Sequence, residues 1–258
     1  MYEKEQYEKA FDLRKKGFTY KKISKELNIV YPGTVRGWIE TGKIPRGRFL
    51  NSNFQNLSSE LGYILGVIGG DGYVIVKRTK GRIGLEVKDQ DFAQHFHNQL
   101  AQWSGLKFSL GFNQNKKLYT TILYSLRAAR FLKDFDIYNL INADNKIKAN
   151  FLRGLFDSEG CVQAYNLRTL RKATRFISFH NSDEKLVFFV KTLLESLGIR
   201  VQNIDKIIGS GFIKHGVYFR LRVGGKQNLK MFKDEIGFSI KRKNKKLEEL
   251  LKSYQDNY

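Results

Sequence analysis

The sequence of 258 residues is short of cysteine, of acidic residues and of long apolar runs, and each shortage excludes a class of protein. The single cysteine, Cys161, excludes an internal disulfide framework and a cysteine-based zinc site. No uninterrupted apolar run reaches the length of a bilayer span, and the opening stretch MYEKEQYEKA lacks the apolar centre of a signal peptide. The sequence therefore predicts a soluble protein that stays in the cytoplasm.

Acidic residues are outnumbered by basic ones. The chain has 46 Lys and Arg against 25 Asp and Glu, which gives a formal net charge of +21 that is spread along its length. With 41% hydrophobic residues it can still build a core. A chain this basic repels itself unless it binds a polyanion, and nucleic acid is the commonest one. The composition favours a nucleic-acid partner over a lysine-coated thermophile surface or an anionic membrane surface.

Residues 1–48 are expected to form a separate helical domain. Three short stretches have helical apolar spacing, YEKAFDLRKKG, TYKKISKELN and TVRGWIETGK, with a tight turn between the second and the third. This arrangement resembles a helix-turn-helix, in which the third helix would present Tyr31, Thr34 and Arg36 to the DNA major groove. The alternative is a three-helix bundle that only packs on the main domain. The polar, aperiodic residues 49–57 are expected to be a linker.

The rest of the chain repeats itself. The stretches ILGVIGGDG and LRGLFDSEG both end in an acid and a glycine, and the two acids, Asp71 and Glu159, lie 88 positions apart (159 − 71). Each stretch is followed by two strand-like segments, an apolar-periodic helix, two further strands and a last helix. The sequence therefore predicts an α+β fold with the order αββαββα in each half, residues 58–146 and 147–258, related by a pseudo-twofold axis.

Small residues recur at every fourth position of the two repeated helices. They are Gly62, Gly66 and Gly70 in the first helix and Asn150, Gly154 and Ser158 in the second. Residues four apart share a helix face, so each helix can bring its backbone against the other. The two acids would then meet at two negative helix ends, an arrangement that a divalent cation such as Mg²⁺ would relieve. The alternative is two unrelated helix stops.

The two repeats resemble the paired signature motifs of single-chain LAGLIDADG homing endonucleases, over about residues 58–250. The resemblance implies a monomer whose two sheets form a saddle over the DNA major groove. It also implies that the last acid of each motif, Asp71 and Glu159, binds a divalent metal, Mg²⁺ or Mn²⁺, activates water and cuts one strand. Gly70 and Ser158 complete the expected metal site.

Basic residues are expected to support this chemistry. Family enzymes usually carry a lysine or glutamine at the end of the second strand of each half, and Lys88 matches this position in the first half. In the second half Asn181 or Ser182 stands there, which predicts unequal cutting of the two strands or a weakened activity. A second basic position, before the last helix, is matched by Lys241 and more loosely by Lys146. The alternative for each lysine is a solvated phosphate contact.

DNA recognition is expected from strand residues that face away from the helices. The stretch VYFRLRV alternates, which predicts that Tyr218, Arg220 and Arg222 point outward. Arginines on such a ribbon can read guanine edges or bind phosphate. The other residues expected to contact DNA, by the same alternation or from hairpins, are Tyr73, Ile75, Lys77, Arg82, Gln163, Tyr165, Arg168 and Arg171.

Together these features predict a monomeric, Mg²⁺-dependent, site-specific endonuclease that cuts double-stranded DNA at a long asymmetric site. The helix-turn-helix would bind the flank of that site. No protein-splicing segment is evident around the chain, so an intron-encoded or free-standing enzyme active in intron homing is expected rather than an intein. Two alternatives stay open. One is a DNA-binding transcriptional regulator that kept the fold without cutting, and the other is an RNA maturase.

Overall fold

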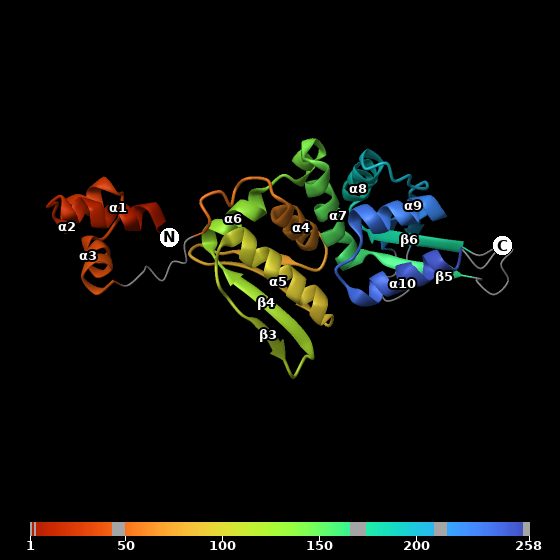
Figure 1. The fold of residues 1–258 in the computed structure, drawn as a ribbon, viewed down its shortest axis with the longest axis horizontal. Coiled ribbons are helices and arrows are strands. Elements are labelled where there is room, and N and C mark those ends of the chain that lie inside the picture. The colour runs from red at the N-terminus through yellow and green to blue at the C-terminus, as the bar shows by residue number, and fades with distance from the viewer. Residues whose placement is uncertain (1, 3, 43–49, 166–173, 209–215, 255–258) are drawn as a thin grey trace.

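The computed structural model describes residues 2, 4–42, 50–165, 174–208 and 216–254. The described chain has two separate hydrophobic cores, one before residue 43 and one after residue 49 (Figure 1). No helix within these ranges is both long and apolar enough to cross a membrane.

The N-terminal part consists of the helices α1 (Lys4–Lys15), α2 (Tyr20–Glu26) and α3 (Pro32–Thr41). The hydroxyl of Thr19 accepts a hydrogen bond from the backbone N–H of Lys22 and so caps α2. Pro32 stands in the first turn of α3, where its missing N–H leaves no carbonyl without a partner. The core of this unit is formed by Ala10, Ile23, Leu27, Ile29, Val35 and Trp38.

The remaining chain forms two halves with the same order of elements. The first half contains α4 (Ser59–Ile68), β1 (Tyr73–Val76), β2 (Gly81–Val87), α5 (Gln90–Ser104), β3 (Leu110–Asn113), β4 (Leu118–Tyr124) and α6 (Leu126–Asp134), followed by the 3-10 helix η1 (Ile137–Asn142). The second half contains α7 (Asn145–Glu159), β5 (Cys161–Tyr165), β6 (Thr174–Asn181), α8 (Glu184–Ser196), β7 (Asp205–Ile208), β8 (Val217–Gly224), α9 (Lys226–Met231), the π-helical turn η2 (Phe232–Ile236) and α10 (Lys241–Lys252). The αββαββα order is thus confirmed in both halves, and α10 is an addition to the second.

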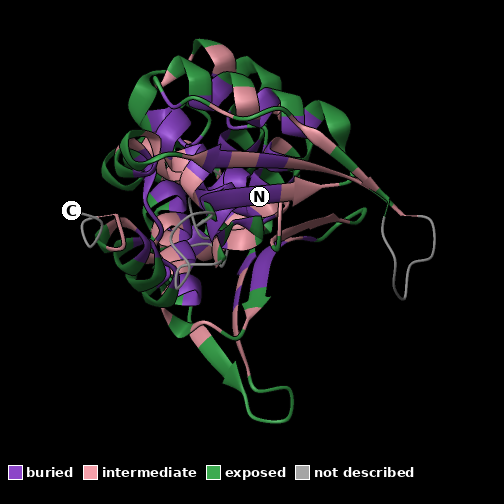
Figure 2. Cartoon of the chain, turned by 90° about the vertical axis from the view of Figure 1, so that its right-hand side faces the viewer, coloured by how far each residue is buried: buried purple, intermediate pink, exposed green. Residues whose placement is uncertain are grey.

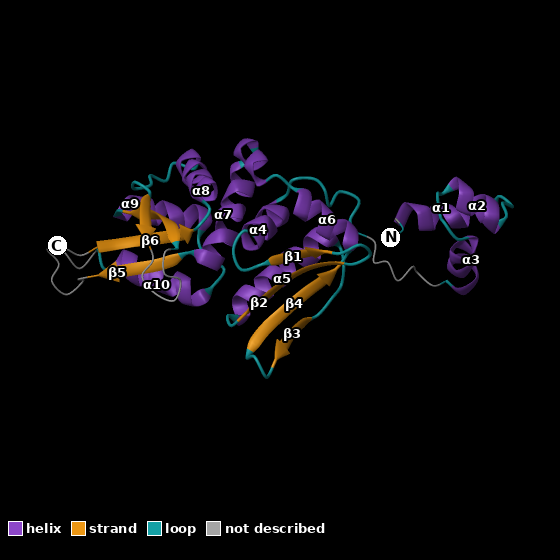
Figure 3. Ribbon diagram, turned by 180° about the vertical axis from the view of Figure 1, so that it is seen from behind, coloured by secondary structure: helices purple, strands orange, loops and turns teal. Residues whose placement is uncertain are grey.

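Each half contains one antiparallel sheet of four strands. The strand orders are β1-β2-β4-β3 and β5-β6-β8-β7, so the two sheets have the same topology. Figure 3 shows one sheet on either side of the central helices α4 and α7. Alternate residues such as Ile83 and Leu85 of β2 are fully buried against the helices, which leaves the other face of each sheet free of helix.

The two halves meet through the backbones of α4 and α7. A Cβ atom on Gly66 would collide with the carbonyl oxygen of Phe151, and one on Gly154 would collide with the carbonyl oxygen of Tyr63. These contacts are reciprocal, because both residue pairs are related by the same offset of 88 (154 − 66 and 151 − 63). The pseudo-twofold axis therefore passes between the two helices, which lie in parallel.

The main core lies on both sides of this helix pair. Figure 2 shows that buried residues concentrate in the central helices and the inner strand positions, while the β3–β4 hairpin projects with an exposed tip. The flanking residues Ile64, Leu65 and Val67 of α4 and Leu155 and Phe156 of α7 are buried, as the small-residue spacing predicts.

The described part of the stretch expected to be a linker, residues 50–57, is attached to α5. Phe54 is only 2% exposed, and its carbonyl oxygen accepts a 2.6 Å hydrogen bond from the indole N–H of Trp103. The side-chain amide of Asn51 donates to the carbonyl oxygens of Gln102 and Trp103. The segment is anchored on α5 because a single buried aromatic ring, without any periodic pattern around it, is enough to fix an irregular stretch.

The helix contact makes a first prediction. Gly66→Ala should lower the free energy of unfolding by about 2 kcal/mol or more, because backbone atoms of α7 cannot rotate away from the new methyl group. Gly111→Ala is the matched control, since its Cβ would lie 3.8 Å from the nearest atom, the carbonyl oxygen of Thr120. Denaturant unfolding of the two variants measures the difference, and equal stabilities would contradict the contact.

Candidate active site

The two acids stand at the same end of the helix pair but in different local structures. Glu159 is the last residue of α7, whereas α4 ends at Ile68 and Asp71 lies in the turn that follows. In that turn the backbone N–H groups of Gly70 and Gly72 both donate to the carbonyl oxygen of Val67. The expectation that the first helix ends on its acid is therefore corrected. The glycines after Ile68 loosen the helix before the acid is reached.

The acids lie close enough to influence each other. A Cβ atom on Gly70 would lie 2.9 Å from the hydroxyl oxygen of Ser158 and 3.3 Å from Cγ of Glu159. Burial, and next the charge of Asp71, raises the pKa of the Glu159 carboxyl. Burial likewise raises the pKa of Asp71, although both side chains reach solvent. The alternative of two unrelated helix stops does not fit this geometry.

A lysine from α10 supplies the positive charge beside the acids. The ammonium group of Lys243 donates to the carbonyl oxygens of Phe156 at 2.9 Å, of Asp157 at 2.5 Å and of Ser158 at 3.4 Å. It therefore caps the C-terminal end of α7, which carries partial negative charge. Burial lowers the pKa of Lys243 to about 8. Its charge in turn lowers the pKa of Asp71 below what burial alone would give.

Sequence reasoning missed Lys243 and favoured Lys241, two residues earlier. Lys241 is exposed at the start of α10, where its backbone N–H donates to a carboxylate oxygen of Asp91 at 2.6 Å. Lys243 instead shares the buried stripe of α10 with Leu247 and Leu250. The sequence signal for this position is helical spacing, because Leu247 and Leu250 follow Lys243 by four and seven residues and so lie on the same face of α10.

The start of α10 is attached to the first half. Arg242 makes two hydrogen bonds of 2.8 Å to the carboxylate of Asp89, which precedes α5. A bidentate arginine–carboxylate pair fixes orientation better than a single contact. The helix that delivers Lys243 is therefore held across the boundary between the two halves.

The structure decides which residue of the second half corresponds to Lys88. Lys88 directly follows β2 and is exposed, and Asp89 then precedes α5. In the second half Asp183 precedes α8, so Ser182 occupies the position of Lys88. Asn181 is the last residue of β6, and its side-chain oxygen accepts a hydrogen bond from the N–H of Asp183.

Lys146 lies far from the acids. It is the second residue of α7, and Glu159 is the last. With a rise of 1.5 Å per residue the 13 steps between them span roughly 20 Å. The looser match of Lys146 to the second basic position is therefore not supported, because a repeat in sequence can place a residue at the wrong end of its helix.

A third acid, Asp157, is buried and links the two helices through hydrogen bonds. Asp157 is 1% exposed, and its carboxylate accepts hydrogen bonds from the hydroxyl of Tyr63 at 2.8 Å and from the hydroxyl and backbone N–H of Ser239 at 2.6 and 2.9 Å. Burial raises the pKa of Asp157. Because these donors satisfy both oxygens, Asp157 joins α4, α7 and the segment before α10.

The residues at the helix ends offer the donor set of a hard cation. Carboxylate and carbonyl oxygens suit Mg²⁺ or Mn²⁺, and Mg²⁺ is usually held by one or two carboxylates with water and phosphate oxygens completing its shell. Asp71, Glu159 and the backbone of Gly70 fit such a cation, while the carbonyl of Ser158 is shared with Lys243. No group of three or more His, Cys, Asp or Glu residues that could hold a metal occurs in the described parts of the chain.

The helix-free face of the second sheet carries the arginines that the alternation predicts. Leu221 and Val223 of β8 are fully buried, so Tyr218, Arg220 and Arg222 lie on the opposite face. Gln163 and Tyr165 of β5 are on that face as well, by their pairing with β6. The two arginines are not free, however, because both bind the carboxylate of Asp205 on β7. Arg168 and Arg171 lie outside the described residues.

The corresponding face of the first sheet carries Tyr73, Ile75 and Arg82. Tyr73 pairs with Gly84 and Ile75 with Arg82 across β1 and β2. A Cβ atom on Gly84 would lie 2.5 Å from the hydroxyl of Tyr73, so the ring folds over this glycine. Lys77 lies outside β1, in the exposed turn where its N–H donates to the carbonyl oxygen of Lys80.

The residues of the N-terminal unit that are expected to contact DNA lie at the start of α3. Tyr31 precedes the helix and is 68% exposed, and Thr34 is half-buried. Arg36 is exposed but forms a 2.7 Å ion pair with Glu40, one helical turn later. An exposed pair of this kind contributes little to stability and can be exchanged for a phosphate contact.

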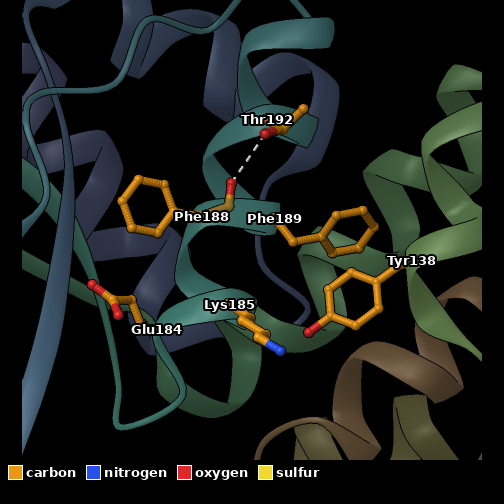
Figure 4. A pocket seen from close by; sticks show the side chains of 6 residues that line it. All are labelled: Tyr138, Glu184, Lys185, Phe188, Phe189 and Thr192. Carbon is orange, nitrogen blue, oxygen red and sulfur yellow. Dashed lines mark hydrogen bonds between the residues drawn. The ribbon is translucent and has the colours of Figure 1, made fainter.

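A hollow on the described surface is lined by none of the acids or arginines described above. It has a volume of about 720 Å³ and lies on α8 and η1 (Figure 4), where Phe188, Phe189 and Tyr138 provide apolar walls. Because α8 covers the helix side of the second sheet, this hollow faces away from the arginines and the acids.

Comparisons with known proteins agree with this geometry. Residues 146–237 match the LAGLIDADG-like domain. The chain is 30% identical to the uncharacterized protein MJ0398 of Methanocaldococcus jannaschii, in an alignment of 261 residues that covers 93% of this chain and 91% of that protein. Residues 146–237 therefore form a LAGLIDADG-like domain.

Solved structures share the fold. The homing endonuclease I-DmoI in complex with DNA and Mn superposes with a TM-score of 0.52 at 18% identity, over 70% of this chain and 98% of that one. Full-length DUF199/WhiA from Thermotoga maritima superposes with a TM-score of 0.51 at 18% identity, over 80% of this chain and 64% of that one. The duplicated α+β architecture with two four-stranded sheets is thus that of the LAGLIDADG proteins.

The cap made by Lys243 leads to a second prediction. Lys243→Met should lower the free energy of unfolding by about 2 kcal/mol, because the carbonyl oxygens at the end of α7 lose charged hydrogen bonds. Lys241→Met, at the exposed start of the same helix, should change it by less than about 0.5 kcal/mol. Guanidinium unfolding compares the two variants, and a Lys243→Met protein as stable as the wild type would refute the capping role.

Proposed function

We propose that this chain is a monomeric, site-specific endonuclease that makes double-strand breaks in DNA with the help of Mg²⁺ or Mn²⁺. The observation that supports it most is the convergence of Asp71, in the turn after α4, with Glu159, at the end of the parallel helix α7. Burial and the charge of Asp71 raise the pKa of Glu159, and a carboxyl group with a raised pKa destabilises the folded protein at neutral pH. A site for a cation explains why both are present.

The residues around the acids have distinct roles in this proposal. Asp71 and Glu159, with the backbone of Gly70, would hold the cation. The chemistry that such a cation supplies when bound is the acidification of a water and the neutralisation of phosphate charge. Lys243 places positive charge beside both carboxylates, which opposes the rise in their pKa that burial causes. Lys88 and Lys241 are exposed and adjoin the paired residues Asp89 and Arg242, and they would donate to phosphate oxygens.

DNA would lie across the helix-free faces of the two sheets. The net charge of +21 supports a polyanionic partner. The residues proposed to contact it on these faces are Tyr73, Lys77, Arg82, Gln163, Tyr165, Tyr218, Arg220 and Arg222. Tyr31, Thr34 and Arg36 would contact the flank of the site if the N-terminal unit acts as a helix-turn-helix.

A non-cutting DNA-binding regulator is the second candidate, and two observations favour it. Ser182 replaces the basic residue that Lys88 provides in the first half. Lys243 already places a cation beside the acids, so part of the electrostatic strain is relieved within the chain. Retention of an acid at the end of both motifs favours the endonuclease instead.

Cleavage of a plasmid library with random inserts tests the two candidates. In Mg²⁺ the wild type should produce double-strand breaks at one defined sequence. Asp71→Asn and Glu159→Gln should each slow cleavage by about a hundredfold or more, because each removes a charged ligand of the cation that would neutralise the phosphate. Asp134→Asn and Glu235→Gln, exposed acids on α6 and η2, are the matched controls and should cut normally.

Two further readouts separate the outcomes of this experiment. Mg²⁺ or Mn²⁺ should raise the thermal unfolding midpoint of the wild type and not that of Asp71→Asn, since ligand binding stabilises only a protein that has the site. Sequence-specific binding without breaks at any insert would establish the regulator and reject the endonuclease.

The proposed role of the N-terminal unit makes a separate prediction. Because residues 2–42 have their own hydrophobic core, a protein lacking residues 1–45 should keep the unfolding transition of the main domain. Its affinity for the selected site should fall at least tenfold, with a smaller dependence on salt concentration, because phosphate contacts are lost. Unchanged affinity and an unchanged salt slope would remove DNA binding from this unit.

A further inference from the structure

Unpartnered polar atoms gather at one place on the second sheet. Four buried side-chain atoms have no hydrogen-bond partner among the described residues, and three of them belong to Ser178, His180 and Arg222. The fourth, Nε2 of His95, lies apart from them against the ring of Tyr63. A buried polar atom without a partner costs free energy, so three in one cluster mark an unusual polar site on this sheet.

The strand register brings the three residues together. Ser178 stands opposite Arg222 and His180 opposite Arg220 in the pairing of β6 with β8. Asp205 of β7 stands on the other side of Arg220. Side chains of paired residues lie on the same face, so these five form one patch on the helix-free side. We call them the Asp205 cluster.

Asp205 fixes the two arginines. Its Oδ2 atom accepts hydrogen bonds from Nη2 of Arg220 and Nη2 of Arg222, both at 2.8 Å, and from Nε of Arg220 at 3.2 Å. Two guanidinium groups spaced two residues apart on one strand would otherwise repel each other. Arg222 is also 5.5 Å from the ring of Phe176, which restricts it further.

This arrangement suits a base edge better than a phosphate. The carboxylate cancels one of the two positive charges and would repel the DNA backbone. The guanidinium forks are oriented in advance and keep unused N–H groups, as bidentate recognition of the O6 and N7 atoms of guanine requires. Burial, and next the charge of Arg220, lowers the pKa of His180, which disfavours a positive charge on the ring beside the forks.

We propose that the Asp205 cluster reads guanine in the major groove of the DNA site, with Asp205 as the residue that positions Arg220 and Arg222. Ser178, which is fully buried, and His180, which is partly exposed, complete the polar lining of the cluster beside the two arginines. This inference rests on the proposed binding of double-stranded DNA and adds a base preference and a specificity-determining residue to it.

Selection from a randomised duplex library with the full chain, in a chelator that prevents cleavage, tests the proposal. The wild type should select sites with guanine at one or two adjacent positions. Asp205→Asn should lower that preference about tenfold or more while its affinity for unselected DNA stays equal or rises, since a negative charge is removed. Asp205→Glu should restore the preference. Lys206→Gln, the exposed neighbour on the other face, is the matched control.

Arg222→Lys is the second variant, for the case in which Asp205→Asn does not fold. It keeps the positive charge but lacks the guanidinium fork, so it should lose the same preference for guanine. If Asp205→Asn weakens binding to all sequences equally, or selects the same guanines as the wild type, the proposal is wrong and DNA binding stands. If the wild type selects no sequence, the proposed function itself fails, and the role of the Asp205 cluster fails with it.

Discussion

The structure depends on backbone contact between α4 and α7. Gly66 and Gly154 have no side chains that would hold the helices apart. Gly66 faces the carbonyl oxygen of Phe151, and Gly154 faces the carbonyl oxygen of Tyr63, the residue that corresponds to Phe151 in the repeat. This contact sets the pseudo-twofold axis, and the axis in turn brings Asp71 and Glu159 to one place. Packing of small residues therefore decides the electrostatics of the site, since it aligns the turn after α4 with the C-terminal end of α7.

The electrostatic problem at that place is solved partly within the protein. Two acids at two helix ends would be unfavourable, and Lys243 lowers this cost through three carbonyl oxygens of α7 and through its charge. The lysine is buried, so its position is rigid, and Arg242 holds the same helix against Asp89 of the other half. The site is consequently built from both halves and from the one helix that has no counterpart in the repeat.

Most of the fold was predictable from the sequence because it follows periodic patterns. The repeat offset of 88, the small-residue stripe and the alternation of β8 predicted the halves, the helix contact and the exposed faces. What escaped prediction depends on single contacts without a period. The anchoring of Phe54 and the pairing of Arg220 with Asp205 need three-dimensional proximity, which spacing along one chain does not report. Helical spacing assigns Lys243 to the apolar face of α10, but it does not report which carbonyl oxygens the lysine caps.

The anchoring of Asn51 and Phe54 on α5 limits how far the N-terminal unit can travel. From Gly42 to Leu50 the chain takes eight steps (50 − 42), which span at most about 28 Å. Along B-form DNA, with 3.4 Å per base pair, that distance is roughly eight base pairs. If both units bind one duplex, the length of this connection limits the spacing between the two bound sites. The flanking half of the recognition sequence must then begin within one helical turn of the central one.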